Sequence, residues 1–316
     1  MLNFVYCLDK NYNIQALTSI NSLIEKTSEI INIYIIHDEP DTLKLDNLTN
    51  TEKANLNLYK IDVNNIDFPN LTSAHVSRAT YFRLYFSNFL PKDLDFVIYI
   101  DADILCLNDP IKDIKDIKNK LRTSNYKIAA RTEVKRINKQ ISENSHFERL
   151  NLSGDNYFNA GVMVIDYQYW LNNQVEKQLL KIMDENFKEI KFWDQDILNK
   201  FFDSNYIELN ENCNFDFGIY NLDKYDEINI LNNVIFLHYQ GKGKPWNIQN
   251  ITFDSSLIYQ KEFRKLNLGY YHLVFYPKIK SLKFFLKYLF CFNFLNLEKP
   301  KIFLTQSIKS LLKFKV

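Results

Sequence analysis

The sequence predicts an α/β fold in which helices flank a mostly parallel, doubly wound central sheet. Apolar runs of strand length alternate with helical patterns through the first half of the chain, an order typical of parallel sheets. The run at residues 96–100 contains no charged or strongly polar residue, which indicates a strand buried on both faces in the middle of such a sheet. Sheets of this kind bind ligands at the carboxyl ends of their strands.

The composition is that of one large globular domain with an appendage. Of the 316 residues, 46% are hydrophobic and 24% are charged, as in ordinary folded domains. The four cysteines are scattered without a CxxC pair, which argues against a zinc site or disulfide framework and fits a reducing cytosol. The N-terminus does not resemble a signal peptide, and no apolar stretch approaches the roughly 18 residues of a membrane-spanning helix.

The first half of the chain follows the order that this fold requires. The apolar run at 4–8 predicts a buried strand, and the spacing of the apolar residues after it predicts a helix. Strands are expected at 30–36 and 56–63, with a helix between them at 43–54. No Gly-x-Gly-x-x-Gly motif follows the first strand, so a nucleotide would have to be held by side chains and a metal ion.

The remaining elements are less regular. Residues 75–90 have helical periodicity on one face, and Pro91 ends that helix. The charged stretch at 109–117 is expected to be exposed, and residues 135–151 are expected to form a polar, mobile segment. Further strands are expected at 126–130, 157–166 and 234–237, and further helices at 169–190 and from 193 onward.

Asp101 and Asp103 follow the central strand with one small residue between them. Two carboxylates in this position can hold a divalent cation through oxygen ligands, and such a cation neutralises charge on a departing diphosphate. An Asp-rich turn is the simpler interpretation, because Asp is common in turns. The rest of the chain favours the cation site, because it carries further motifs in a fixed order.

Four segments carry a resemblance to a known family. They are Ile-Tyr-Ile-Asp-Ala-Asp at 98–103, Tyr-Phe-Asn-Ala-Gly at 157–161, Asp-Gln-Asp-Ile-Leu-Asn at 194–199, and residues 238–246. With these segments the chain resembles glycosyltransferase family 8, in particular its bacterial lipopolysaccharide galactosyl- and glucosyltransferases. The likeness covers residues 1 to about 250. It implies a GT-A fold with a Rossmann-like sheet, a nucleotide-sugar donor, Mn²⁺ with Mg²⁺ as the alternative ion, and retention of anomeric configuration.

The resemblance assigns Asp101, Asp103 and His238 as metal ligands. Two carboxylates and one imidazole leave positions open for two diphosphate oxygens, and they suit Mn²⁺ better than Zn²⁺. Without the aspartate pair, His238 would be read as an ordinary histidine after a strand. Lys244 matches the lysine that meets the diphosphate as a point charge, and Gly241 would let the backbone approach closely.

The resemblance also implies a set of residues that bind the donor. Uracil and ribose would meet the end of the first strand, although Asp9 equally fits a turn there. Asn159 aligns with a contact to the donor sugar, and the small residues after it would give the sugar room. Arg83 aligns with a basic residue near the donor, or lies on a solvated helix face. The set comprises Cys7, Asp9, Asn11, Arg83, Asp101, Ala102, Asn159, Ala160, Gly241 and Lys244.

Asp194 and Gln195 are the catalytic candidates that the resemblance implies, with Asp194 on the sugar hydroxyls and Gln195 near the anomeric carbon. An amide is a poor nucleophile, so we expect front-face attack in which the departing UDP oxygen accepts the acceptor's proton. Double displacement through a carboxylate is the alternative. The acids also fit the start of a helix, which is the interpretation we adopt for Asp196. Where the family often has an acid that touches the sugar, this chain has Arg-Thr-Glu at 131–133, so Glu133 fills that place by a shift or the sugar differs.

Residues 269–316 form a basic tail. They contain nine lysines, no arginine and one acid, a net charge of +8, whereas 30 basic and 37 acidic residues leave the first 268 positions at −7. The lysines alternate with aromatic and aliphatic residues, a pattern typical of helices that lie on an anionic membrane surface. The alternative is a helical pair that packs on the body with solvated lysines. No nucleic-acid partner is expected, because no such motif is present.

These observations predict a catalytic domain at 1–268 and a membrane-associating helical tail at 269–316. The expected function is transfer of glucose or galactose from a UDP-sugar to a bacterial surface glycan, lipopolysaccharide or lipooligosaccharide, with an oligosaccharide or lipid-linked acceptor. The expected location is cytoplasmic, on the inner face of the cytoplasmic membrane. A protein- or self-glycosylating transferase of the same family and a non-catalytic nucleotide-sugar-binding protein are the alternatives.

Overall fold

The computed structural model describes residues 1–63, 66–71, 77–133, 146–216, 227–241, 243–266, 268, 271–275 and 278–312. Within these residues a seven-stranded sheet has the order β3-β2-β1-β4-β7-β6-β8, and a three-stranded sheet has the order β5-β10-β9. The strands are β1 Asn3–Leu8, β2 Ile31–His37, β3 Ala54–Lys60, β4 Phe96–Ile100, β5 Ile104–Cys106, β6 Ile128–Thr132, β7 Phe158–Asp166, β8 Ile207–Glu208, β9 Phe215–Asp216 and β10 Phe236–His238. The α-helices are α1 Asn13–Lys26, α2 Ile111–Thr123, α4 His146–Leu150, α5 Tyr167–Asn172, α6 Val175–Glu185, α7 Trp193–Phe202, α8 Glu227–Asn233, α9 Asp254–Arg264, α10 Lys278–Phe290 and α11 Pro300–Leu312.

The large sheet confirms the predicted mostly parallel α/β architecture. Neighbouring strands are parallel except β7, which runs antiparallel to both β4 and β6. This reversal places the first residues of β7 beside the last residues of β4, where the Asp101 N–H donates to the Gly161 carbonyl at 2.9 Å. The carboxyl ends of β1, β4 and β6 and the start of β7 therefore share one edge of the sheet.

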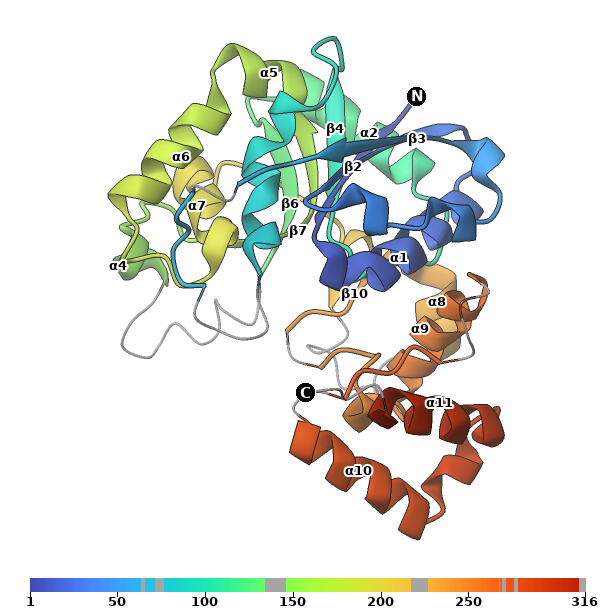
Figure 1. Ribbon diagram of the computed structural model, residues 1–316. Coiled ribbons are helices and arrows are strands. Elements are labelled where there is room, and N and C mark those ends of the chain that lie inside the picture. The colour runs from blue at the N-terminus through green and yellow to red at the C-terminus, as the bar shows by residue number, and fades with distance from the viewer. Residues whose placement is uncertain are drawn as a thin grey trace.

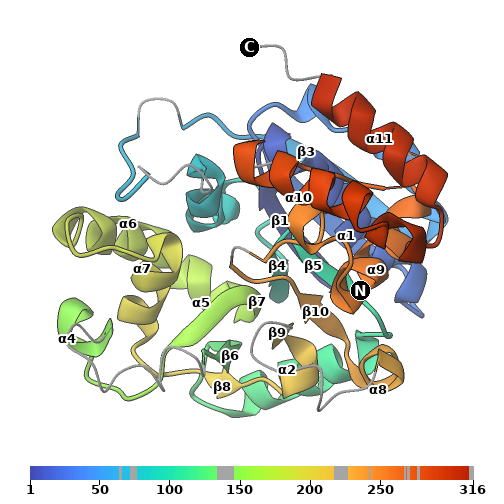
Figure 2. The same ribbon diagram turned by 90° about the horizontal axis from the view of Figure 1, so that it is seen from below.

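Two hydrophobic cores lie on opposite faces of the large sheet. One core packs α1, α2, α9 and the small sheet against one face, and the other packs α5, α6 and α7 against the second face. Figures 1 and 2 show α6 and α7 on one side of the sheet and α1 and α9 on the other. The central strand β4 is buried along its whole length, because both faces are covered as its apolar sequence requires.

Two expected helices differ from the structure. The helix predicted at 43–54 is wrong: the chain there forms 3₁₀ turns at Leu45–Asn47 and Thr51–Lys53, with Asn50 in the left-handed region at φ 54°. Asn and Asp side chains compete with helical hydrogen bonds and favour such turns. Within 75–90 the described part is a 3₁₀ helix at Arg78–Asn88 with no single apolar face, and residues 72–76 lie outside the described residues.

Two further expectations were also wrong. The charged stretch at 109–117 opens α2, whose isoleucines at 111, 114 and 117 are buried at helical spacing while the lysines between them face solvent. The single helix predicted at 169–190 is divided into α5 and α6 by Gln174, which has φ 49°. Of the polar segment predicted at 135–151, residues 135–145 lie outside the described residues and α4 follows them.

The tail forms the two helices α10 and α11. They bury their own small core, which includes Phe285, Tyr288 and Phe303 and also joins Ile248 and Ile251 of the body. In Figure 1 both helices lie at the end of the molecule opposite to the N-terminus, below α9, and in Figure 2, which is seen from that end, they lie in front of α1 and α9. No helix among the described residues has the length and apolarity needed to cross a bilayer.

Candidate active site

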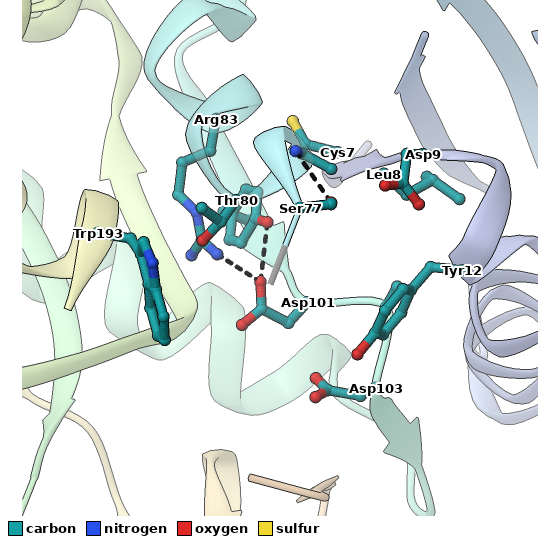
Figure 3. A pocket seen from close by; sticks show the side chains of 13 residues that line it. Cys7, Leu8, Asp9, Tyr12, Ser77, Thr80, Arg83, Asp101, Asp103 and Trp193 are labelled. Atoms are coloured by element: carbon teal, nitrogen blue, oxygen red, sulfur yellow. Dashed lines mark hydrogen bonds and ion pairs between the residues drawn. The ribbon is translucent and has the colours of Figure 1, made fainter. Parts of the chain in front are cut away.

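A pocket opens at the edge of the sheet where β1 and β4 end (Figure 3). Of the predicted donor-binding residues, Cys7, Asp9, Arg83, Asp101 and Ala102 line it together with Asp103. The full lining is Cys7, Leu8, Asp9, Tyr12, Ser77, Ala79, Thr80, Arg83, Tyr99, Asp101, Ala102, Asp103 and Trp193. The predicted ligand crevice thus lies at the carboxyl edge of the sheet.

The end of β1 contributes Cys7 and Asp9 to this pocket. Asp9 caps the turn after the strand, accepting from the Asn11 N–H at 2.9 Å and from its side-chain amide at 3.3 Å, so it is a turn residue and a pocket residue at once. Asn11 is exposed and is not among the lining residues. Burial raises the pKa of the Cys7 thiol well above its usual range, which keeps it neutral.

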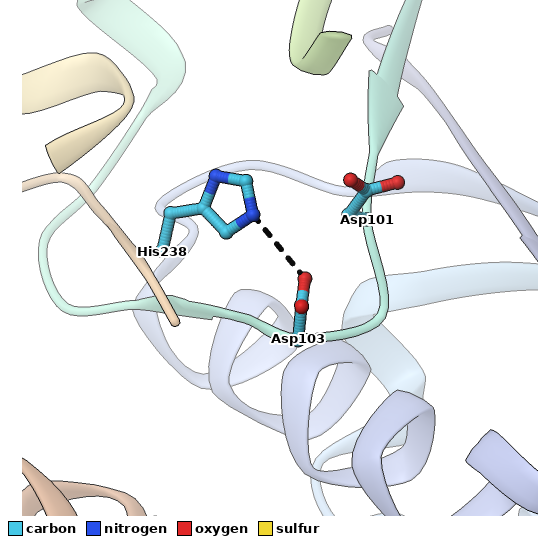
Figure 4. Close-up of side chains that lie close together, drawn as sticks. All are labelled: Asp101, Asp103 and His238. Atoms are coloured by element: carbon cyan, nitrogen blue, oxygen red, sulfur yellow. Dashed lines mark ion pairs between the residues drawn. The ribbon is translucent and has the colours of Figure 1, made fainter. Parts of the chain in front are cut away.

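Asp101, Asp103 and His238 come together as a candidate metal site (Figure 4). One ligand atom from each lies within 4.8 Å of the others, and His238 Nε2 is 3.4 Å from Asp103 Oδ1. The sheet pairing causes this, because β10 runs antiparallel to β5 and sets His238 opposite Ile104. His238 follows Asp103 by 135 positions in the sequence, yet the pairing of β10 with β5 brings it beside the two aspartates.

The orientation of His238 is fixed by two neighbours. Asn214 donates to Asn159 through its amide nitrogen at 2.9 Å, so its oxygen accepts from His238 Nδ1 at 2.9 Å. This leaves Nε2 directed toward Asp103, as in sites where a second residue sets the tautomer of a metal-binding histidine. The ring packs on Gly161, where an added Cβ would lie 2.4 Å from His238 Cε1. The room at Gly161 expected for a sugar is therefore occupied by the imidazole.

Lys244 forms an ion pair with Asp103 and donates to the Tyr239 carbonyl at 2.8 Å. Burial would raise the pKa of Asp103, but Lys244 and His238 outweigh it and hold the pKa well below its usual range. For His238, burial alone would lower the pKa, but the neighbouring Asp103 carboxylate outweighs burial, and the pKa of His238 is raised above its usual value. Asp103 is thus a carboxylate at neutral pH, as a metal ligand must be.

Arg83 is buried and connects three parts of the site, which excludes the solvated helix face. Its guanidinium donates to Asp101 Oδ1 at 2.7 Å and to the Ala160 carbonyl at 2.5 Å, and its Nε lies 2.6 Å from Asp194 Oδ2. The same group lies 4.1 Å from the centre of the Tyr99 ring, and the Tyr99 hydroxyl donates to Asp101 at 2.8 Å. Figure 3 shows Arg83 reaching toward Asp101 across the pocket wall.

Asp194 and Gln195 lie in the first turn of α7, where both oxygens of Asp194 and the side-chain oxygen of Gln195 have polar partners. Asp194 accepts from the Thr80 hydroxyl at 2.6 Å besides its ion pair with the guanidinium. Burial raises the pKa of Asp194 to about 6, against the lowering effect of that ion pair. Gln195 Oε1 accepts from the Ala160 N–H at 3.1 Å and from Asn159 Nδ2 at 3.4 Å.

Glu133 enters the site through an irregularity in the sheet. After Ala130 the pairing of β6 with β7 shifts by three residues. The side chain of Glu133 is 2% exposed, and its Oε2 accepts from Asn159 Nδ2 at 3.2 Å and from Gln240 Nε2 at 3.1 Å. Glu133 therefore lies beside Asn159, the predicted sugar contact, and the register shift between β6 and β7 brings it there.

Asp196 has a larger structural role than starting a helix. It is fully buried and accepts from both ends of the Arg149 guanidinium at 2.7 and 3.0 Å. The Tyr157 hydroxyl donates to it at 2.7 Å, and the N–H groups of Lys191 and Phe192 each donate at 2.8 Å. Asp196 therefore fixes the start of α7 against α4 and β7.

Sequence reasoning missed several residues of the site, namely Thr80, Tyr99, Trp193 and Asn214. Tyr99 was counted only as part of the apolar strand, and Asn214 follows no motif. Trp193 directly precedes the Asp-Gln-Asp motif, which was the one available signal. Of the predicted residues, Gly241 adopts φ +68° and a Cβ there would meet no atom within 4 Å.

A mostly parallel sheet whose carboxyl edge carries two aspartates, a histidine and a lysine is the arrangement that the motifs predicted for GT-A glycosyltransferases. The family model for glycosyl transferase family 8 matches residues 3–250. The chain belongs to this family, which confirms the resemblance seen in its motifs.

The relatives and solved structures agree with this assignment. A lipopolysaccharide 1,2-glucosyltransferase of Escherichia coli is 28% identical over 309 residues, covering 87% of this chain and 86% of its own. A lipopolysaccharide 1,3-galactosyltransferase of Salmonella typhimurium is 27% identical over 253 residues, covering 78% and 73%. The structure of the galactosyltransferase LgtC with donor and acceptor sugar analogues matches with a TM-score of 0.65 at 20% identity, over 83% of this chain and 95% of that one. This match establishes the GT-A fold.

Proposed function

We propose that the chain is a metal-dependent, retaining hexosyltransferase that moves glucose or galactose from a UDP-sugar to a bacterial surface glycan, lipopolysaccharide or lipooligosaccharide. The observation that carries the proposal is the cluster of Asp101, Asp103 and His238 at the pocket. Two carboxylates and a neutral imidazole nitrogen fit Mn²⁺, with Mg²⁺ as the alternative. The names of the Escherichia coli and Salmonella relatives support the acceptor class.

On this proposal, each part of the donor would meet its own group of residues. The end of β1, with Cys7, Asp9 and the adjoining Asn11, would hold uracil and ribose. A cation held by the cluster would neutralise charge on the diphosphate leaving group, and Lys244 would add a positive charge beside Asp103. Ala102, which lines the pocket, and Gly241 would border this region, and Asn159 and Ala160 would adjoin the sugar.

The engaged state of Asp194 and Gln195 favours front-face attack. Both Asp194 oxygens are held by Arg83 and Thr80, so the carboxylate is poorly placed to become a nucleophile. The Gln195 amide is held by Ala160 and is intrinsically a weak nucleophile. The bond from the anomeric carbon to UDP would break as the acceptor oxygen bonds on the same face, and the departing UDP oxygen would take the acceptor's proton.

The tail supports a peripheral location on the inner face of the cytoplasmic membrane. One side of α10 packs on the body, while its other side exposes Ile279, Leu282, Leu286 and Phe290 to solvent. Lysines at 280, 283 and 287 flank this exposed stripe. An apolar stripe bordered by cations is the pattern of helices that lie in an anionic membrane surface. The tail would thereby hold the catalytic domain close to a lipid-linked acceptor.

The test is UDP release from a panel of UDP-sugars, with Mn²⁺ and with EDTA. We expect slow hydrolysis of one UDP-hexose that requires the metal, and Asp103→Asn should lower it on the order of a hundredfold while circular dichroism shows a folded protein. Sugar found on the protein itself would favour the self-glycosylating alternative. If calorimetry detects no metal-dependent UDP binding, the transferase proposal is wrong.

A further inference from the structure

Trp193 holds an unusual backbone conformation at the pocket. It is the first residue of α7 and has φ 53°, a left-handed value that bulky residues rarely adopt. The turn is maintained by the buried Asp196, which accepts from the N–H groups of the two preceding residues at 2.8 Å. Because Asp196 is held in turn by Arg149, the surrounding structure forces the backbone of Trp193 into this position.

The indole ring of Trp193 is held in place by a hydrogen bond and an aromatic contact. Its Nε1–H donates to the Asn70 carbonyl at 2.9 Å, and the Asn70 side chain donates back to the Lys191 carbonyl at 2.7 Å. The Phe192 ring contacts it edge to face, with centroids 6.4 Å apart. The one polar atom of the indole is therefore satisfied outside the pocket, and what Trp193 contributes to the lining is the apolar ring.

The position of Trp193 along the pocket indicates what this ring would meet. In Figure 3 Asp9 and Tyr12 lie on one side, Asp101 lies in the middle and Trp193 lies on the opposite side. On the proposed function, the nucleoside occupies the Asp9 side and the diphosphate the middle, so the ring of Trp193 faces the region of the sugars. Gln195 Nε2, two residues along, is buried without a hydrogen-bond partner among the described residues, which leaves a donor for a sugar hydroxyl.

We propose that the Trp193 indole is a stacking platform for a pyranose ring and thereby helps to decide which sugar is accepted. A pyranose presents C–H groups on its face and hydroxyls at its edge, so an aromatic face beside amide and carboxylate groups suits it. This inference rests on the proposed function. The ring bound there belongs either to the donor hexose or to the terminal hexose of the acceptor, and the experiment separates these two sources.

The experiment compares Trp193→Leu and Trp193→Phe with wild type in the presence of metal. Calorimetry measures the affinities of UDP and of UDP-hexose, and initial rates give KM for a saccharide acceptor. We expect Trp193→Leu to keep its affinity for UDP within about twofold. A loss of about tenfold should appear in UDP-hexose affinity if the donor ring stacks, or in acceptor KM if the acceptor ring stacks, and Trp193→Phe should restore most of it.

Phe187→Leu is the matched control, because Phe187 is exposed in the connection before α7 and lies outside the pocket lining. Unchanged affinity for both sugars in Trp193→Leu overturns the stacking platform. So does an equal loss of UDP and UDP-hexose affinity, since that indicates a structural role for Trp193. Failure of wild type to bind UDP with metal is a separate result, and it rejects the proposed function itself. In that case the fluorescence of Trp193, obtained by subtracting the spectrum of Trp193→Phe from that of wild type, decides whether a free acceptor saccharide still binds at this ring.

Discussion

Gly161 shows how one residue without a side chain positions a candidate metal ligand. The His238 ring lies against it, and the Cβ of any other residue would come within 2.4 Å of His238 Cε1 and 2.9 Å of Nδ1. Both contacts are shorter than carbon and nitrogen atoms tolerate, so one of the two residues would have to move. The glycine also lies where residues of β7 change from one core to the other: Ala160 belongs to one and Val162 to the other.

Gly161→Ala should therefore displace His238 and break its bond to Asn214. We expect at least a tenfold loss of Mn²⁺ affinity, because second-shell changes cost about that much, and a loss of about 1–3 kcal/mol in the free energy of unfolding from overpacking. Calorimetry with Mn²⁺ and UDP and chemical denaturation measure the two effects.

Gly243→Ala is the control for this substitution, because a Cβ at Gly243 would meet no atom within 4 Å. Its Mn²⁺ affinity should equal that of wild type. If Gly161→Ala also binds Mn²⁺ normally, the packing of His238 on this glycine does not determine the site.

Adjacency in the sequence decided which site residues could be predicted. Asp101 and Asp103 are two positions apart after an apolar strand, and that pattern is visible in the sequence. His238 was found through its motif. The sequence could not predict the contacts of Asn214 and Glu133 with the site, because these contacts arise from strand pairing and from a register shift between β6 and β7.

At the scale of elements, apolar runs predicted every strand of the large sheet except the two-residue β8, whereas helix predictions failed where local sequence overrides or hides the periodicity. Gln174 interrupts what reads as one amphipathic pattern, and the charged sequence of α2 conceals its buried isoleucine face. The reversed direction of β7 follows from the connection between strands, which periodicity does not report. Local patterns identify elements, and long-range packing decides how they are joined.

The exposed stripe of α10 gives a prediction for the tail. Phe290 is 78% exposed and Leu286 is 41% exposed, and neither belongs to the tail's buried core. Replacing both with glutamate should lower partitioning onto anionic phospholipid vesicles at least about tenfold, because apolar burial and attraction to the lipid are lost together. Cosedimentation measures the bound fraction.

Phe187→Glu, which places one glutamate on an exposed aromatic of the body, should leave vesicle binding intact. Raising the salt concentration should weaken wild-type binding, since the lysines act through a screened field. Vesicle binding by the doubly substituted tail at wild-type strength would show that α10 does not contact the membrane.

At the scale of the whole molecule, His272 lies where the tail meets the body. It is 7% exposed, stacks on Trp246 at 5.7 Å and exchanges backbone hydrogen bonds with the side chain of Gln260 in α9. The Tyr259 hydroxyl lies 2.9 Å from its Nδ1. Burial lowers the pKa of His272 to about 3, so the folded protein keeps this ring neutral.

This pKa predicts acid sensitivity between pH 6.5 and about 3. In that range the unfolded chain binds a proton at position 272 that the folded protein does not, so the free energy of unfolding falls as pH falls. Between pH 7 and pH 5 wild type should lose about 2 kcal/mol more than His272→Gln. Urea denaturation at the two pH values measures the difference, and equal losses in both proteins would exclude His272 as a cause.

The short connection between the site and the tail has a consequence for the acceptor. Lys244 pairs with Asp103, and Ile248, four residues later, is already part of the tail's core. The carbonyl of Lys244 accepts from the N–H of Asn247 at 3.1 Å and from the side chain of Asn250 at 3.0 Å, so this stretch is braced from within. A tail resting on lipid would then fix the height of the pocket above the bilayer. The enzyme would then select acceptors by length, because only a glycan whose growing end stands at the height of the pocket above the membrane could reach it.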